Sequence, residues 1–288
     1  MASLRQIRSR IRSIQSSKQI MRAMQLVSAS KLKRAQTRLM QARNTMAFLD
    51  SILQRVLASS SAVDHPLVQK RDGPSALVVL TSDAGLCGSY NTNLIQMAEA
   101  HLRRDAARTT RLIFIGKKGY RHFTKRGYPA LQSYLDLAGR PNLARAAEIA
   151  RALTQAFLSG SVASISVLHS RFASSSVYKP TINTWLPLTL SLAETGAKVL
   201  KGGVDYLLEP SPERVLGDLL PRWAVAKFQL AMLESFTSEH SARMIAMKNA
   251  TDNAQTLLNE LTTQRNKVRQ AAITKELSEI VGTAEALK

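Results

Sequence analysis

The stretch that decides the fold is LRQIRSRIRSIQSSKQIMRAMQLVSASKLKRAQTRLMQARNTMAFLDSILQRV, which runs from Leu4 to Val56 and contains neither glycine nor proline. Apolar residues recur in it with alternating spacings of three and four. The positions of this repeat are Leu4, Ile7, Ile11, Ile14, Lys18, Met21, Gln25, Ser28, Leu32, Ala35, Leu39, Ala42, Met46, Leu49, Leu53 and Val56. A period of about 3.5 residues predicts a long helix that supercoils around a partner helix.

The partner helix is predicted near the other end of the chain. Ser211 followed by Pro212 is typical of an N-cap and a first helical residue, and residues 222–281 contain neither glycine nor proline. The repeat of this segment is Leu230, Leu233, Thr237, His240, Met244, Met247, Thr251, Ala254, Leu258, Leu261, Arg265, Val268 and Ala272. We therefore expect residues 1–60 and 211–288 to form an intramolecular coiled coil.

The middle segment, residues 61–210, is predicted to be an α/β domain. All nine prolines lie between Pro66 and Pro221, and twelve of the thirteen glycines lie between Gly73 and Gly217. Short apolar runs indicate strands, and segments of helical composition lie between them, an alternation that predicts a doubly wound sheet. The strand candidates are 76–80, 111–115, 162–168, 177–190 and 204–208, and the helix candidates are 91–104, with Asn91 as its cap, and 142–159, ending at Gly160.

Charge is distributed very unevenly along the chain. The sequence has 40 Lys and Arg against 20 Asp and Glu, a formal net charge of +20, and the first acidic residue is Asp50. Such a basic helix is expected to meet an acidic partner, which is either a protein or a nucleic acid. The first aromatic residue is Phe48, so the basic segment before it has no side chain on which the bases of a single strand could stack. Binding to the backbone of a nucleic-acid duplex stays open. No apolar stretch approaches the roughly 20 residues of a membrane-spanning helix.

The motif closest to known chemistry is the turn TSDAGLCGSYN, Thr81–Asn91, which follows a predicted strand. Nucleotide sites of α/β folds occupy that position, but the turn lacks both common phosphate-binding glycine patterns, as does the segment Gly116–Gly119. Cys87 is the only cysteine, and the five histidines show no paired spacing. The residues by themselves therefore predict no catalytic, cofactor-binding or metal site.

Three segments carry a resemblance to a known family. RQIRSRIRSIQSSKQIMRAMQLVSASKLKRAQ (Arg5–Gln36), the turn Thr81–Asn91 and ESFTSEHSARMIAMKNATDNAQTLLNELTTQRNKVRQAAITKELSEIVGTAEAL (Glu234–Leu287) resemble the gamma subunit of F-type ATP synthases. The stretch Tyr206–Pro210 is also similar to that family. The resemblance covers both terminal helices and the framework of the middle segment.

The resemblance implies an antiparallel coiled coil that turns inside a ring of alternating alpha and beta subunits, with the α/β domain and epsilon resting on the membrane ring of c subunits. It implies a non-catalytic rotor that couples proton flow to ATP synthesis and binds no nucleotide. Because the chain starts at Met1 without a presequence, it resembles a bacterial subunit on the cytoplasmic face of the inner membrane.

The resemblance also assigns contact residues. Those expected to contact the beta subunit are Met24, Cys87, Asn266, Arg269 and Gln270. Those expected to contact the c ring or epsilon are Tyr206 and Glu209.

Overall fold

The computed structural model describes residues 4–58, 65–104, 110–137, 142–189, 209 and 211–286. It divides into two units. The coiled-coil unit contains residues 4–28 and 243–286, and the sheet unit contains the described residues between 29 and 242. Two long helices, α1 (Leu4–Ala58) and α5 (Pro212–Ala286), contribute to both units.

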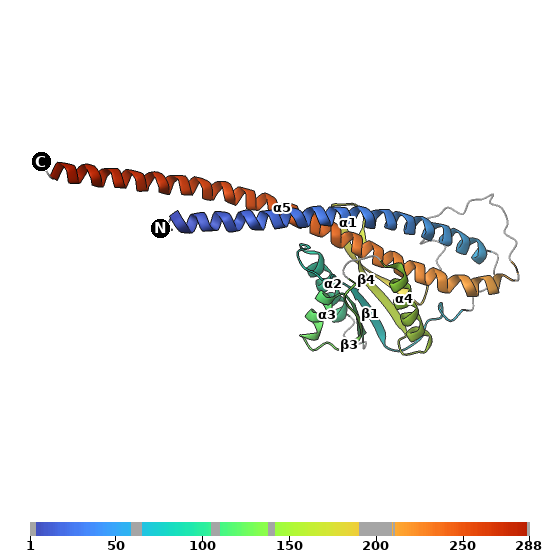
Figure 1. The fold of residues 1–288 in the computed structure, drawn as a ribbon. Coiled ribbons are helices and arrows are strands. Elements are labelled where there is room, and N and C mark those ends of the chain that lie inside the picture. The colour runs from blue at the N-terminus through green and yellow to red at the C-terminus, as the bar shows by residue number, and fades with distance from the viewer. Residues whose placement is uncertain are drawn as a thin grey trace. The chain divides into compact units, whose positions relative to one another are not determined.

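In the coiled-coil unit, α1 and α5 run side by side in opposite directions (Figure 1). Ile7 and Ile11 of α1 pack against Leu258 and Leu261 of α5 in one apolar cluster. Further along α1, Lys18 donates a hydrogen bond to Gln255, so rising numbers on one helix face falling numbers on the other. The antiparallel coiled coil is confirmed.

The heptad positions of α1 are the buried ones, as the sequence predicts. None of the sixteen is exposed, and even the polar members follow the pattern: Ser28 is buried, while Lys18 and Gln25 are half-buried. On α5, every predicted stripe residue is buried or half-buried except Ala272. A repeat of this kind marks the face that each helix presents to its partner.

The sheet unit contains five strands in the order β3-β2-β1-β4-β5. β1 is parallel to both of its neighbours, β2 and β4, and β2 is also parallel to β3. β5 pairs with β4 in the antiparallel direction. The strands are β1 (Ser75–Leu80), β2 (Thr110–Ile115), β3 (Ala130–Tyr134), β4 (Ser164–Phe172) and β5 (Tyr178–Leu186). The parallel, doubly wound centre is confirmed.

Helices cover both faces of the sheet. Alternate residues of β1 point to opposite faces: Leu77 and Val79 pack with α2 (Tyr90–Arg104) and α3 (Lys117–Thr124). Val78 and Leu80 pack with α4 (Leu143–Leu158) and with segments of α1 and α5. Figure 1 shows α2 and α3 on one side of the strands and α4 on the other. A sheet buried on both faces explains the continuous apolar runs of its strands.

Two predicted helix starts are confirmed. The Asn142 side chain accepts a hydrogen bond from the amide of Arg145 and caps α4, and α5 begins at Pro212 after Ser211. Hydrogen bonds from the backbone amide of Glu213 itself and from the Ser211 side chain lower the pKa of the Glu213 carboxyl. A carboxylate stabilised in the first turn complements the positive end of a helix.

The sequence analysis does not anticipate α3 and β3. α3 has eight residues with a glycine inside it, and β3 has five residues with alternating exposure at the edge of the sheet. Elements this short carry little periodic signal, and packing against their neighbours decides them. The strand candidate at 204–208 lies outside the described residues.

Candidate functional site

The turn after β1 is closed by its own side chains. Asn91 Oδ1 accepts hydrogen bonds from the amide and the hydroxyl of Ser82, both at 3.0 Å. Asn91 Nδ2 lies 3.1 Å from the sulfur of Cys87. The prediction that Asn91 caps α2 is wrong, because the helix already begins at Tyr90; the amide side chain braces the turn instead.

The place where an α/β fold would hold a phosphate is filled by the chain itself. Three successive amides at the start of α3, Lys117–Gly119, donate to Asp83 Oδ1, Ser82 O and Thr81 Oγ1 at 3.0, 3.0 and 2.9 Å. Asp83 Oδ1 also accepts from the amide of Asp136 at 3.3 Å. These donors are the groups that bind anions at helix N-termini. An anion at the start of α3 would have to displace the Asp83 carboxylate from Lys117, the Ser82 carbonyl from Lys118 and the Thr81 hydroxyl from Gly119.

Cys87 is an interior residue of this turn. It is 2% exposed, and its sulfur lies 3.7 Å from the Ser82 hydroxyl. Burial raises the pKa of the nearby Tyr178, and the Cys87 side chain adds to this rise. The next residue back, Leu86, is 59% exposed and has a positive φ of 61°. The exposed part of this turn therefore includes Leu86, whereas Cys87 is buried.

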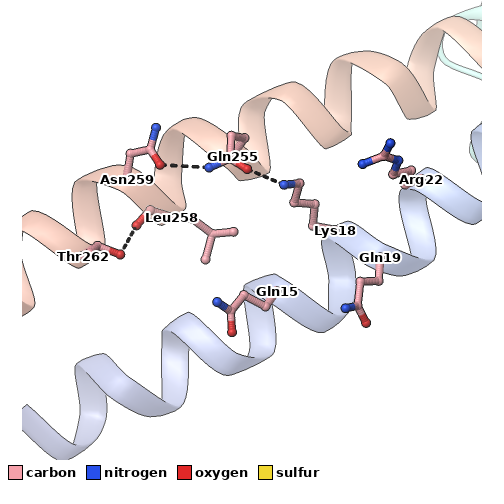
Figure 2. Close-up of a pocket in the computed structure, with 8 residues that line it drawn as sticks. All are labelled: Gln15, Lys18, Gln19, Arg22, Gln255, Leu258, Asn259 and Thr262. Atoms are coloured by element: carbon pink, nitrogen blue, oxygen red, sulfur yellow. Dashed lines mark hydrogen bonds between the residues drawn. The ribbon is translucent and has the colours of Figure 1, made fainter.

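The coiled-coil unit carries a polar groove about 600 Å³ in volume (Figure 2). Residues of α1 and α5 face each other across it, and Lys18 spans it to Gln255. Gln255 in turn donates to Asn259 at 2.9 Å. The lining residues are Gln15, Lys18, Gln19, Arg22, Gln255, Leu258, Asn259 and Thr262. The groove lies where the α1 repeat turns from isoleucine to lysine, so the two helices here meet through long polar side chains.

The α1 surface of this unit is strongly basic. Between residues 4 and 28 it carries six Lys and Arg and no acidic residue, and Arg5, Arg8, Arg10 and Arg12 are all exposed. In the part of the chain that the structure describes, none of these four arginines forms an ion pair. An unneutralised row of this kind attracts an acidic surface.

The predicted contact residues fall at separate places. Met24 is half-buried, as is Asn266, whereas Arg269 and Gln270 are exposed. Since Lys18 faces Gln255, a rise of about 1.5 Å per residue places Met24 and Asn266 roughly 25 Å apart along the coiled-coil unit.

The two other expected contact sites lie elsewhere in the chain. Glu209 is exposed, and Tyr206 lies outside the described residues. The contact roles of all these residues stay predictions.

A stripe near the end of α5 is missing from the predicted site. Ile273, Leu277, Ile280 and Val281 are 50–63% exposed, although their spacing of four, three and one places them on one helical face. The signal that could have found them is this spacing, which continues past the last residue of the predicted stripe, Ala272. Exposed apolar residues gathered on one face make this stripe a candidate protein contact.

The described residues offer neither a metal site nor a membrane-spanning helix. They contain no group of three or more His, Cys, Asp or Glu placed to hold a metal ion. Among their helices, none combines the length and the apolar character that crossing a bilayer requires.

Comparison with known proteins places this combination of helices and sheet. Residues 3–287 match the family model described as ATP synthase. The ATP synthase gamma chain of Symbiobacterium thermophilum is 40% identical over 98% of this chain and 97% of its own length. That of Moorella thermoacetica is 39% identical over the full length of both.

The chain belongs to the ATP synthase gamma-chain family. As a gamma chain it is a subunit of ATP synthase with the central-stalk role. The nucleic-acid alternative receives no support from these relatives.

Solved structures agree on the fold. The gamma-chain fold here is similar to a chain of the Euglena gracilis mitochondrial ATP synthase in rotational state 3, with a TM-score of 0.70 at 20% identity over 99% of this chain and 94% of that one. It is also similar to a chain of the central stalk and c-ring of the Tetrahymena thermophila enzyme, with a TM-score of 0.59 at 24% identity over 80% and 99%.

Proposed function

We propose that this gamma chain is a rotating shaft that couples proton flow to ATP synthesis without catalysing any step itself. The observation that carries the proposal is the pair of long helices, 55 and 75 residues, which pack antiparallel in the coiled-coil unit through Ile7, Ile11, Leu258 and Leu261. A shaft must transmit torque without local unfolding, and long helices packed along an apolar seam meet that requirement.

The outer surface of the coiled-coil unit supports a rotating contact rather than a fixed one. Its α1 surface is basic, and the large apolar residues that α1 exposes in this unit are Ile20, Leu26 and Val27. Charged, hydrated surfaces form weak contacts that break easily. We propose that Met24 passes the beta subunits, and that Asn266, Arg269 and Gln270 meet them further along α5.

The sheet unit is proposed to connect the shaft to the membrane part of the complex. In this proposal Glu209 and Tyr206 meet the c ring or epsilon, and the turn containing Cys87 faces a beta subunit through the exposed Leu86. The alpha and beta subunits, epsilon and the c ring are the proposed partners. The three-part division at residues 60 and 211 belongs to the same proposal. So does a peripheral location on the cytoplasmic face of a bacterial inner membrane, which the bacterial relatives support.

The proposed absence of catalysis has a physical basis in the strand-end turn. Asp83 and its neighbours occupy the amides that a nucleotide phosphate would need. In this proposal the chain binds no nucleotide and transmits the energy of proton flow only by rotating. The catalytic sites that this rotation drives belong to the partner subunits.

The test is reconstitution. Alpha and beta subunits are purified with and without this chain, and ATP hydrolysis is measured; the complex is then joined to epsilon and the membrane sector, and ATP-driven proton uptake into vesicles is followed. We expect the chain to co-purify with alpha and beta, to restore proton uptake, and to hydrolyse no ATP alone. A chain that fails to associate with alpha and beta, or that hydrolyses ATP by itself, contradicts the proposal.

The control is a variant that keeps the fold but loses the basic face. Replacing Arg5, Arg8, Arg10 and Arg12 by glutamine leaves the buried stripe intact, because all four are exposed. We expect slower or weaker assembly that becomes less sensitive to salt. If the salt dependence of assembly is unchanged, the basic face is not the docking surface.

A further inference from the structure

One segment of α5 is buried all the way round. Every residue from Met232 to Arg243 is buried, whereas a helix surrounded on all sides is normally apolar. The polar residues of this segment are Glu234, Ser235, Thr237, Ser238, Glu239, His240, Ser241 and Arg243. Buried polar groups are unfavourable unless they are hydrogen-bonded, so the partners of these side chains explain why the segment is built this way.

Glu234 joins α5 to α1 and to β4. Its Oε1 accepts a hydrogen bond from Arg43 Nη2 at 2.6 Å, and its Oε2 lies 3.3 Å from His169 Nε2. The same Arg43 nitrogen donates to the carbonyl of Phe172 at 2.5 Å. One carboxylate, 10% exposed, therefore holds a residue of the first helix and a strand of the sheet together.

The next turns of α5 join it to α2 and again to β4. The Tyr90 hydroxyl is 2.7 Å from Ser235 Oγ and 3.1 Å from the Ser235 carbonyl. Ser238 Oγ donates to the carbonyl of Ser170 at 3.1 Å, and Ser241 Oγ donates to the carbonyl of Ser175. Four polar residues within eight positions of α5 thus bond to α1, α2, β4 and the turn after β4.

These hydrogen bonds differ in kind from the contacts that α5 makes nearer its N-terminus. Further toward its start, α5 packs on the sheet through apolar residues such as Leu220, Phe228 and Met232. Apolar contact depends on buried area and has no preferred direction, so by itself it specifies the register of two packed elements less sharply than directional bonds do. Hydrogen bonds depend on distance and angle and therefore resist both sliding and twisting of the helix.

We propose that Glu234, Ser235, Ser238 and Ser241, with Arg43, Tyr90 and β4, form a torque joint that fixes the rotational and axial position of α5 against the sheet. This inference rests on the proposed rotor function. Turning of the sheet unit reaches α5 through the joint, and the bond to Arg43 carries it to α1. The side chains act as positioning residues, since they meet no substrate.

A role in stability alone would not select this chemistry. Buried ion pairs and polar networks are commonly replaced by apolar residues without loss of stability. In some proteins an apolar replacement does lose a unique register between packed elements, and we propose that this is what the joint provides here. Register is the property that a rotor needs under load.

The experiment uses three chain variants in the reconstituted complex. Tyr90→Phe removes one hydroxyl, Glu234→Gln removes one charge, and the double variant removes both. One matched control is Glu148→Gln, an exposed carboxylate that pairs with Arg145 within α4. A second is Ile149→Val, which deletes a buried methylene from the apolar core without touching the joint.

Two quantities are measured for each complex. The first is the number of protons pumped per ATP hydrolysed, recorded as the opposing proton gradient rises. The second is hydrogen exchange of the amides of residues 232–243. We expect the double variant to hydrolyse ATP normally but to lose pumping at a smaller opposing gradient than wild type. Exchange in the segment should be faster by roughly fivefold for each hydrogen bond removed. Both controls should match wild type in pumping.

Each outcome decides the inference. Normal pumping by the double variant up to the wild-type gradient overturns it, as does an equal loss in Ile149→Val, since that would make the effect one of stability. A wild-type chain that restores no pumping at all overturns the proposed function itself, and the inference with it. A loss confined to the joint variants supports both.

Discussion

Replacing Gly116 by alanine should strongly destabilise the sheet unit, because the backbone at this position leaves no room for a side chain. The Gly116 backbone has φ 98° and ψ 148°, a region that side-chain-bearing residues avoid at a cost of about 1–3 kcal/mol. A Cβ placed there would lie 2.0 Å from the carbonyl oxygen of Thr81 and 2.7 Å from its carbon. The atoms in the way are backbone atoms, so no side chain can rotate to make room.

The neighbouring backbone cannot move cheaply either. The amide of Thr81 donates to the carbonyl of Ile115 at 2.7 Å, and the amide of Lys118 donates to the carbonyl of Ser82 at 3.0 Å. Relieving the overlap adds about 1–3 kcal/mol of overpacking. Together the two effects should lower the free energy of unfolding by roughly 2–6 kcal/mol, a large part of the stability of a typical domain.

The assay is urea unfolding of the purified chain, followed by tryptophan fluorescence. Both tryptophans, Trp185 and Trp223, are buried in the sheet unit and report on it directly. The control is Gly85→Ala, because a Cβ at Gly85 would meet only the end of the Lys118 side chain at 3.7 Å; its free energy of unfolding should change by less than about 1 kcal/mol. A Gly116→Ala chain as stable as wild type would refute the reasoning.

Three other perturbations test the two units. Burial opposes ionisation of Glu234, but hydrogen bonds from His169 and Arg43 outweigh it, so the pKa of this carboxyl lies below its ordinary 4.5. The wild-type chain should therefore be more stable than Glu234→Gln by about 1–3 kcal/mol at neutral pH. This difference is complete above pH 4.5 and should disappear as pH falls through the lower folded pKa, which urea unfolding at a series of pH values will show. Ile7 is 1% exposed, so Ile7→Ala should destabilise the coiled-coil unit by about 2–3 kcal/mol and speed hydrogen exchange in residues 4–28. The control is Ile20→Ala: because Ile20 is 61% exposed, its loss should change stability by no more than about 0.5 kcal/mol. Met24→Lys should assemble normally but pump fewer protons per ATP, because an ion pair between this lysine and a carboxylate of a beta subunit would stabilise one rotary position by about 1–3 kcal/mol. Met24→Leu should match wild type. Equal coupling in the lysine variant would remove Met24 from the proposed interface.

The site residues show how far a resemblance reaches. Met24, Asn266, Arg269 and Gln270 come from similarity to a family, and their contact roles depend on subunits that one chain does not contain. The structure adds how much of each side chain is available: Arg269 and Gln270 are exposed, while Cys87 is buried. The resemblance did not supply the exposed stripe from Ile273 to Val281.

The chain's local pattern determined the long elements. A repeat that keeps its register from Leu4 to Val56 admits one buried face, and that face is the one observed, because helical periodicity is set by neighbouring residues alone. The strands β1, β2 and β4 were likewise evident as apolar runs. Short elements were not, since α3 and β3 are stabilised by what they pack against.

Only the tertiary structure decided what the polar side chains do. Asn91 looks like a helix cap in the sequence but braces a turn, because its partner Ser82 lies nine residues away. The segment from Met232 to Arg243 carries an ordinary heptad stripe, which predicts burial of one face. It is buried on every side because α1, α2 and β4 surround it, and the hydrogen-bond partners of Glu234 stand 191 and 65 residues away in the chain. A heptad repeat predicts only the face of a helix that packs against one partner helix. The hydrogen-bond partner of a side chain depends on which distant segments the fold brings next to it.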